Sequence, residues 1–266
     1  MSGNERRPRA RVAASSSWER VATWYDGWVG DKGSWYHRGL AVPAVLDLLH
    51  PTGGEEILDV GAGQGVLAEY IAATGARYTG VDASPRLIEI ARRRHRGSGR
   101  FLLGDARRLR QIPALSAARF DAGVFLLCLQ DMDPLEPVLE SVAWALRPTS
   151  RIVMLMTHPS FRQPRHSGWG FDASRKLRYR RVDAYLTPMS VPMGSAVDGR
   201  RTLAFHRPIS SYINALGSVG YAVDAMLELP DLPPERRPRR SGPSSRAGAG
   251  DEAEIPLFLA MRARRT

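Results

Sequence analysis

The sequence has little of several features that would place it in other classes of protein. It contains one cysteine, Cys128, so an internal disulfide is excluded. Cys128 lies in the apolar segment FLLCL, where a thiol is more often a small buried hydrophobe than a nucleophile. No apolar run approaches the ~20 residues that a membrane helix requires. We therefore expect a cytoplasmic protein that has no membrane partner.

Lysine is also scarce, because Lys32 and Lys176 are the only lysines among 38 basic residues. The formal net charge of +11 is carried by arginines, many of them near the two ends of the chain and in a Pro/Gly/Ser-rich stretch. Nucleic-acid binding calls for a folded basic face with interleaved aromatic side chains, and basic tails alone do not supply one. We therefore do not expect nucleic acid to be the partner.

Length and composition predict one folded domain. A chain of 266 residues with 43% hydrophobic content can bury a full core. Residues 1–17 are basic and contain no apolar segment of a signal peptide, so we predict a disordered tail followed by a domain at 18–266. Within that domain, residues 231–254 are too rich in Pro, Gly, Ser and Arg to form a core, and we predict a mobile loop.

The segment EEILDVGAGQGVLAEY, residues 55–70, is the most informative part of the chain. Ile57 to Val60 predict a buried strand, the glycines after it a tight turn, and Val66 to Ala73 a helix. Such a turn lets the backbone approach a nucleotide closely. Asp59 argues against a dinucleotide pyrophosphate, because its carboxylate would repel the phosphates and attract a cofactor that carries an ammonium and a sulfonium.

Two further acids follow the next two predicted strands. Asp82 ends the strand at 78–82 and can accept both hydroxyls of a ribose, which NAD and S-adenosylmethionine (SAM) share. Asp105 follows the strand at 100–103 and can accept the exocyclic amine of adenine. A dehydrogenase-like domain without SAM would leave Asp59 and Asp105 together unexplained.

The elements ILDVGAGQG, GVDAS, GDA and FDAGVFLLCLQDM resemble the class I SAM-dependent methyltransferases in order and spacing, over roughly residues 20–266. The resemblance implies an α/β fold with a Rossmann-like, seven-stranded, mostly parallel sheet, helices on both faces and a lid at 158–208 between strands five and six. It also implies SAM as the cofactor and S-adenosylhomocysteine (SAH) as the product. The cofactor would be bound by Tyr25, Asp59, Gly61, Ala62, Gly63, Asp82, Ala83, Asp105, Ala106, Leu127 and Cys128.

The later elements fit the same fold. Residues 120–129 predict a central strand, and 133–146 predict a covering helix that Pro148 ends. Further strands are predicted at 151–157, 221–229 and 255–262, and the family places the last one antiparallel to its neighbours.

Substrate identity is expected to lie in the lid, since roughly fifty residues exceed an ordinary crossover. Segments 176–191 and 200–206 predict two paired strands whose turn Gly194 and Gly199 bracket, and Ser210 would cap a short helix. Residues 18–50 would cover the opposite side of the site. The predicted substrate-binding residues are Trp24, Tyr36, His37, Trp169, Tyr179, Tyr185 and His206.

Methyl transfer depends mainly on positioning, and a hydroxyl acceptor also benefits from a base. His37, His158 and His206 are the candidates, and His158 is preferred because it follows the fifth strand at the ligand-facing edge. A hydrogen bond that fixes the lid is the alternative role for His158. Asp131 and Asp133 stand where catechol-type methyltransferases place a magnesium ligand. The acid pair expected after strand five is replaced by Thr157-His158-Pro159, so we predict no metal.

The sequence therefore predicts a SAM-dependent methyltransferase that acts on O, N or C of a small organic molecule, such as a natural-product intermediate of secondary metabolism or antibiotic biosynthesis. Two alternatives stay open: a methyltransferase acting on RNA, DNA or protein, and a SAM-binding module without catalysis. The protein would be a monomer or a homodimer.

Overall fold

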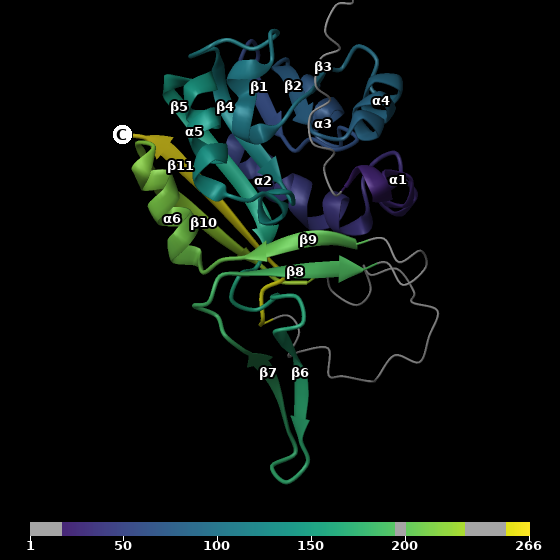
Figure 1. The fold of residues 1–266 in the computed structure, drawn as a ribbon, viewed down its shortest axis with the longest axis vertical. Coiled ribbons are helices and arrows are strands. Elements are labelled where there is room, and N and C mark those ends of the chain that lie inside the picture. The colour runs from purple at the N-terminus through teal and green to yellow at the C-terminus, as the bar shows by residue number, and fades with distance from the viewer. Residues whose placement is uncertain (1–17, 195–200, 232–253) are drawn as a thin grey trace, which may run out of the picture.

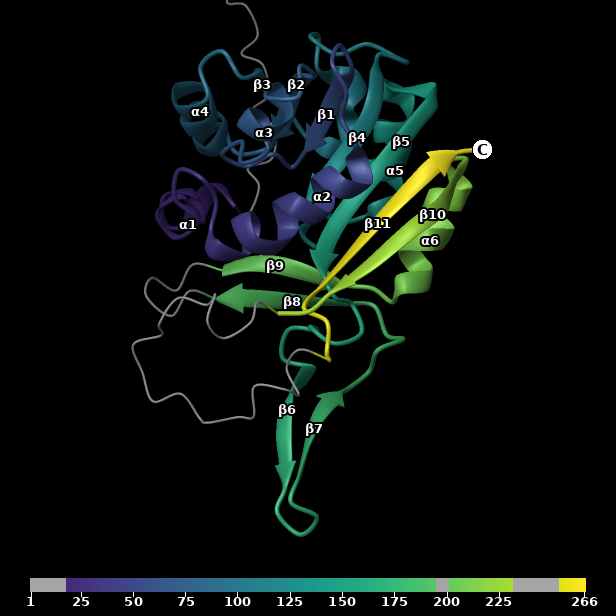
Figure 2. The same ribbon diagram turned by 180° about the vertical axis from the view of Figure 1, so that it is seen from behind.

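The computed structural model describes residues 18–194, 201–231 and 254–266, and its centre is a seven-stranded sheet. The strand order is β10-β11-β5-β4-β1-β2-β3 (Figures 1 and 2). All neighbouring strands are parallel except β11, which is antiparallel to β5 and β10. The predicted fold class is confirmed. The strands are β1 Glu56–Val60, β2 Arg77–Asp82, β3 Arg100–Leu103, β4 Phe120–Leu126, β5 Leu146–Thr157, β10 Tyr221–Leu229 and β11 Phe258–Arg265.

The central strands carry apolar side chains on both faces of the sheet, and these side chains belong to two separate cores. On β1, Leu58 and Val60 join one core, whereas Ile57 joins the other. On β5, Met154 and Val153 divide in the same way. Successive strand residues point to opposite faces, so a strand that is apolar throughout needs a helical layer on each side.

The helices supply these two layers. α5 (Leu135–Ala145) and α6 (Ile209–Ser218) contribute Leu139, Val142 and Leu216 to the first core. α2 (Val42–Leu49), α3 (Ala68–Ala72) and α4 (Pro85–Arg94) pack on the other face. α1 (Ala22–Val29) lies beside α4 in Figure 1. Short non-α turns are η1 Glu19–Val21, η2 His37–Ala41, η3 Ala106–Gln111 and η4 Leu129–Asp131.

The segment between β5 and α6 contains two separate hairpins. β6 (Ser167–Asp172) pairs with β7 (Leu177–Val182), and β8 (Met189–Gly194) pairs with β9 (Arg201–His206). The predicted pairing of 176–191 with 200–206 is therefore wrong in its first half. Trp169 lies in β6, which the sequence analysis left without a strand. In Figures 1 and 2, the β8–β9 hairpin crosses beneath the ends of the sheet strands and the β6–β7 hairpin projects away from the domain.

Several predicted boundaries also differ. The helix predicted to end at Pro148 ends at Ala145, and Pro148 lies within β5, where the pairing with β4 shifts by a bulge. α6 follows Pro208, so Ser210 lies inside the helix and does not cap it. The predicted tail at 1–17, Gly199 and all but Asp231 and Glu254 of the predicted mobile loop fall outside the described residues.

Within the described ranges, no helix is long and apolar enough to cross a membrane. A cytoplasmic location stays a prediction.

Candidate functional site

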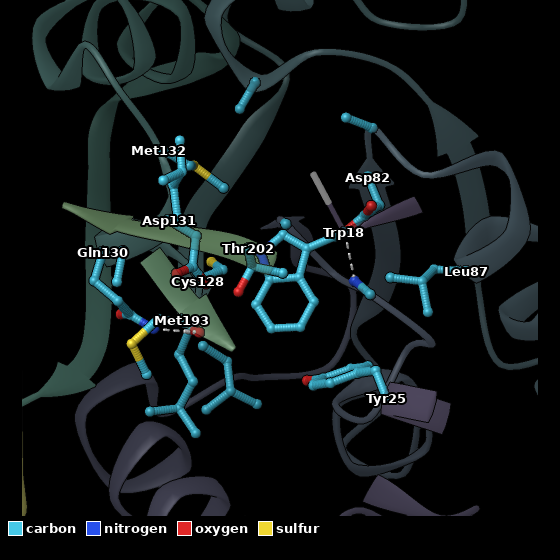
Figure 3. A pocket seen from close by; sticks show the side chains of 18 of the residues that line it. Trp18, Tyr25, Asp82, Leu87, Cys128, Gln130, Asp131, Met132, Met193 and Thr202 are labelled. Carbon is cyan, nitrogen blue, oxygen red and sulfur yellow. Dashed lines mark hydrogen bonds between the residues drawn. The ribbon is translucent and has the colours of Figure 1, made fainter. Parts of the chain in front are cut away.

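A cavity of about 770 Å³ lies at the carboxyl ends of β1, β2 and β4 (Figure 3). Ligands of open parallel sheets bind in this position, because the connections after the strands leave a crevice there. Residues after β3, the N-terminal segment and the β8–β9 hairpin complete its walls. Of the predicted cofactor-binding residues, those that line it are Tyr25, Gly61, Gly63, Asp82, Ala83, Asp105, Ala106, Leu127 and Cys128.

The glycine turn after β1 brings the backbone close to the cavity. Gly61 has φ +73, and its N–H donates to the Val81 carbonyl at 2.8 Å. A Cβ added to Gly61 would lie 2.8 Å from Cβ of Cys128 and 2.7 Å from Cε of Met132. The Cys128 thiol donates to the Val60 carbonyl at 2.9 Å, so it helps to close this turn and is not placed as a nucleophile. Glycine is therefore required at position 61 by both backbone conformation and space.

Asp82 lines the cavity at the end of β2 (Figure 3). Its Oδ2 accepts from the backbone N–H of Gly63 at 2.9 Å, and its Oδ1 accepts from that of Ser84 at 2.8 Å. These bonds fix the carboxylate while leaving further lone pairs for a ligand. Burial raises the pKa of Asp82 and the backbone N–H groups oppose that shift. The arrangement suits a ribose diol.

Asp59 is 2% exposed and is not among the residues that line the cavity. Its Oδ2 accepts from the Tyr78 hydroxyl at 2.7 Å, and its Oδ1 has no hydrogen-bond partner among the described residues. Burial raises the pKa of Asp59 to about 7. The structure therefore places Asp59 behind the glycine turn and not in the cavity wall, contrary to its prediction as a contact residue. A cationic group near this turn would relieve the cost of its unpartnered carboxylate oxygen. Ala62 was also predicted to bind the cofactor, but it does not line the cavity. Its backbone N–H donates to the Val81 carbonyl.

Asp59→Asn should stabilise the protein at alkaline pH. The raised pKa means that the folded state favours the protonated acid, so the penalty is absent below about pH 4 and fully present above about pH 7. Asparagine keeps an acceptor for Tyr78 and removes the charge. We expect a gain of about 2–4 kcal/mol in unfolding free energy at pH 8 that vanishes near pH 4, measured by urea unfolding.

SAH affinity of the same variant should fall at least about tenfold, because the ammonium would lose the negative charge behind the glycine turn. Asp47→Asn, on the exposed side of α2, is the matched control and should change neither quantity. Equal stability of Asp59→Asn and the unmodified protein at pH 8 would contradict the burial of a charge at this position.

Asp105 follows β3 and is paired with Arg107. Its Oδ2 accepts from Nη2 of Arg107 at 2.7 Å, and its Oδ1 accepts from the Arg107 backbone N–H at 2.9 Å. Partial burial raises the pKa of Asp105, but the contacts with Arg107 outweigh it and hold the pKa below its usual range. The carboxylate is ionised at neutral pH and lies at the cavity wall, where the adenine amine is expected.

The N-terminal segment closes one side of the cavity. The Tyr25 ring lies close to Gly63, since a Cβ on that glycine would be 3.8 Å from Cε1 of Tyr25. The Trp18 ring packs edge-on against Tyr25 at 5.0 Å between centroids (Figure 3). The Glu19 carboxylate accepts from the Ser84 hydroxyl and ties this segment to the loop after β2. The predicted substrate residues Trp24, Tyr36 and His37 also line the cavity.

His37 is buried, and desolvation lowers its pKa to about 4, so the imidazole is neutral at physiological pH. Its Nδ1 lies 2.8 Å from the Ser34 hydroxyl. The ring can therefore contact an uncharged acceptor without adding a positive charge.

The β8–β9 hairpin closes the opposite side through Met193, Thr202, Leu203, Ala204 and Phe205. Four predicted substrate residues do not reach the cavity: Trp169, Tyr179, Tyr185 and His206. Trp169 lies in the projecting β6–β7 hairpin. The guanidinium of Arg178 lies over its ring, with Cζ of Arg178 4.1 Å from the ring centroid.

The other three have structural contacts as well. Tyr179 crosses Gly170 in the same hairpin. The Tyr185 hydroxyl accepts from the N–H of Ile209 at 3.0 Å, and Nε2 of His206 lies 2.8 Å from the Tyr185 carbonyl.

His158 is not placed as a base. Its side chain is 1% exposed and is absent from the cavity wall, which the preceding Thr157 does line. Nε2 of His158 lies 2.9 Å from Oε1 of Glu228, and Nδ1 accepts from the backbone N–H of Ser160 at 3.2 Å. Neighbouring residues at a strand end point to opposite faces, so Thr157 and His158 cannot both face the ligand. The geometry favours the alternative role, a hydrogen bond that fixes the inserted segment.

Sequence reasoning missed part of the site. Trp18, Gln130 and the hairpin residues Met193 and Thr202 line the cavity, and Asp131 had been considered only as a possible metal ligand. The signal for Asp131 and Gln130 was their position directly after the fourth strand, where side chains meet the crevice. No group of three or more His, Cys, Asp or Glu side chains is arranged to hold a metal ion within the ranges that the structure describes.

Comparisons with known proteins agree with this geometry. Residues 58–154 match the family model described as a methyltransferase domain. The chain is 37% identical over 121 residues to a demethylmenaquinone methyltransferase of Tropheryma whipplei (strain Twist), covering 44% of this chain and 48% of that protein. It is 46% identical over 92 residues to a ubiquinone biosynthesis O-methyltransferase of Methylocella silvestris, covering 34% of this chain and 32% of that one. The chain thus spans about half or less of the length of these curated relatives.

A solved structure supports the fold over most of the chain. A SAM-dependent methyltransferase from Mesorhizobium loti superposes with a TM-score of 0.70 and 24% identity, covering 89% of this chain and all of that one. The chain thus has the fold of this structure, with an acid-lined cavity at the carboxyl ends of its strands. Residues 58–154 within it match the methyltransferase domain model.

Proposed function

We propose that the chain transfers a methyl group from SAM to O, N or C of a small organic molecule. The observation that carries the proposal is one cavity with two different halves. One half contains the glycine turn with Asp82 and Asp105, which suit the methionyl, ribose and adenine parts of SAM. The other half is formed by Tyr36, Phe205 and the other apolar residues of the hairpin, which suit an organic acceptor.

The chemistry asked of the protein is mainly positioning. SAM supplies an electrophilic methyl group when bound. The apolar walls exclude water and hold the acceptor in line with that methyl group, which can provide most of the acceleration. The names of the relatives, which refer to menaquinone and ubiquinone, support a small acceptor. More specifically, we propose that the acceptor is a natural-product intermediate.

Methyl-labelled SAM tests this function directly. We expect label in the organic extract when the protein is incubated with a panel of small aromatic acceptors carrying hydroxyl or amino groups. Transfer should survive EDTA, because Thr157-His158-Pro159 offers no acid pair for magnesium after β5. Asp172→Ala, in the projecting hairpin, is the control and should retain transfer. Label found only in added RNA, DNA or protein would contradict the small-molecule acceptor, and SAH binding without any transfer would contradict catalysis.

A further inference from the structure

The cavity holds one more carboxylate, and its surroundings differ from those of the cofactor-facing acids. Asp131 is the last residue of η4, the turn that follows β4, and its backbone N–H donates to the Cys128 carbonyl at 2.9 Å. Cys128 contacts the glycine turn at Gly61. η4 also packs against β9, whose residues Thr202 and Phe205 form the apolar wall. Asp131 therefore stands between the turn that faces the methionyl part of the cofactor and the wall that faces the acceptor.

Asp105 has a cationic partner, whereas Asp131 has none among the residues that the structure describes. Asp105 is paired with Arg107, and Asp82 accepts two backbone N–H groups. Across the residues that the structure describes, no salt bridge to Asp131 is found. Its hydrogen-bond partner is the side chain of Trp18, and Figure 3 shows both in the cavity. The indole N–H is a donor only, so it orients the carboxylate without neutralising it.

Burial in these apolar surroundings raises the pKa of Asp131 well above its usual range, with the Trp18 hydrogen bond opposing the shift. Burial and the charge of Asp131 raise the pKa values of Tyr25, Cys128 and Tyr212. Tyr212 is also influenced by the opposite charge of Arg207. A desolvated carboxylate takes up a proton more readily than one in water and is a better general base.

Building on the proposed function, we propose that Asp131 is the general base for a hydroxyl acceptor, so that the acceptor is a hydroxyl-bearing aromatic molecule. The acceptor O–H donates to the carboxylate, and its proton moves to an oxygen of Asp131. The oxygen's electron pair forms the new bond to the methyl carbon. The carbon–sulfur bond of SAM breaks, its electron pair stays on sulfur as SAH, and the proton leaves Asp131 for solvent. Trp18 is a positioning residue that holds the carboxylate.

The first test is binding, with 2-naphthol as the probe and SAH present at saturation. Calorimetry should show 2-naphthol binding at least about tenfold more tightly than its methyl ether, because the ether cannot donate to the carboxylate. In Asp131→Ala the difference should disappear while SAH affinity is retained. Equal affinity of the two compounds for the unmodified protein, including no binding of either, would overturn the assignment.

The second test separates binding from proton transfer. Asp131→Asn can still accept the hydroxyl hydrogen bond but cannot take its proton, so KM should change little and kcat should fall by about 100-fold or more. Asp131→Glu should recover part of kcat, because it restores a base. Glu136→Gln, an exposed acid in the first turn of α5, is the matched control and should keep kcat. The assay uses the panel of hydroxyarenes, with 2-naphthylamine as the amine counterpart.

Two outcomes would overturn the role of Asp131: a kcat of Asp131→Asn within about threefold of normal, or transfer to amines and to no hydroxyarene. Both are distinguishable from failure of the proposed function, in which the unmodified protein would not bind SAH or would transfer no methyl group at all. SAH titration of each variant shows whether it is folded at the cofactor side.

Discussion

Asp82→Ala is expected to lower SAH affinity by at least about 100-fold, or about 2.7 kcal/mol. The ribose hydroxyls of SAH would lose the carboxylate that accepts their two charge-assisted hydrogen bonds. The N–H groups of Gly63 and Ser84 would lose the same acceptor, so that the glycine turn is less well ordered. Isothermal calorimetry with SAH measures the change.

Asp172→Ala is the matched control for this experiment. The Asp172 carboxylate accepts from the N–H of Ser174, two residues on, at 2.9 Å, as Asp82 does from Ser84 at 2.8 Å. Asp172 lies in the projecting hairpin and does not line the cavity. The Asp172→Ala substitution should leave SAH affinity unchanged. An Asp82→Ala protein that bound SAH normally would remove the ribose assignment.

Gly61→Ala is expected to destabilise the protein by about 2–4 kcal/mol and to weaken SAH binding. The new methyl group would occupy a residue with φ +73 and would meet Cys128 at 2.8 Å. A left-handed conformation costs a non-glycine residue about 1–3 kcal/mol, and overpacking adds a similar amount. Urea unfolding gives the stability, and calorimetry gives the affinity.

Gly97→Ala separates the two causes. Gly97 has φ +89 but nothing within 4 Å of an added Cβ, so it reports the backbone strain alone. It should cost about 1–2 kcal/mol and leave SAH affinity unchanged. If Gly61→Ala were no more destabilising than Gly97→Ala, the close approach of Cys128 to the turn would not matter.

The carboxylates at the centre of the site make the protein less stable than a neutral site would. Burial raises the pKa values of Asp59, Asp82 and Asp131, so each favours a proton or a cation. A ligand that carries positive charge relieves this penalty on binding. Strain of this kind persists at functional sites because the surrounding fold holds the groups in place.

Much of the fold could be predicted because local pattern and fold agree. The largely apolar segments at 57–60 and 120–129 predicted buried parallel strands, and β1 and β4 at these positions contribute side chains to both cores. The acids at the strand ends were also informative. Strand ends meet at one edge of a parallel sheet, so residues far apart in sequence were expected to gather there.

The side chains of the inserted segment could not be predicted in the same way. Short alternating segments have no unique partner, and the choice between β6 and β9 as the partner of β7 depends on packing that the pattern does not contain. Trp169 and Tyr179 were expected at the substrate side, but the β6–β7 pairing places both in the projecting hairpin. His158 shows a second limit, because topology locates a strand end but one residue decides which face a side chain occupies.

The central claim is that the cavity binds the SAM family of cofactors, and titration of the unmodified protein with SAH and with NADH in the same calorimeter tests it most directly. The glycine turn with Asp59, Asp82 and Asp105 predicts saturable binding of SAH and no measurable binding of NADH, whose pyrophosphate would be repelled by these carboxylates. Binding of NADH in preference to SAH would contradict the account.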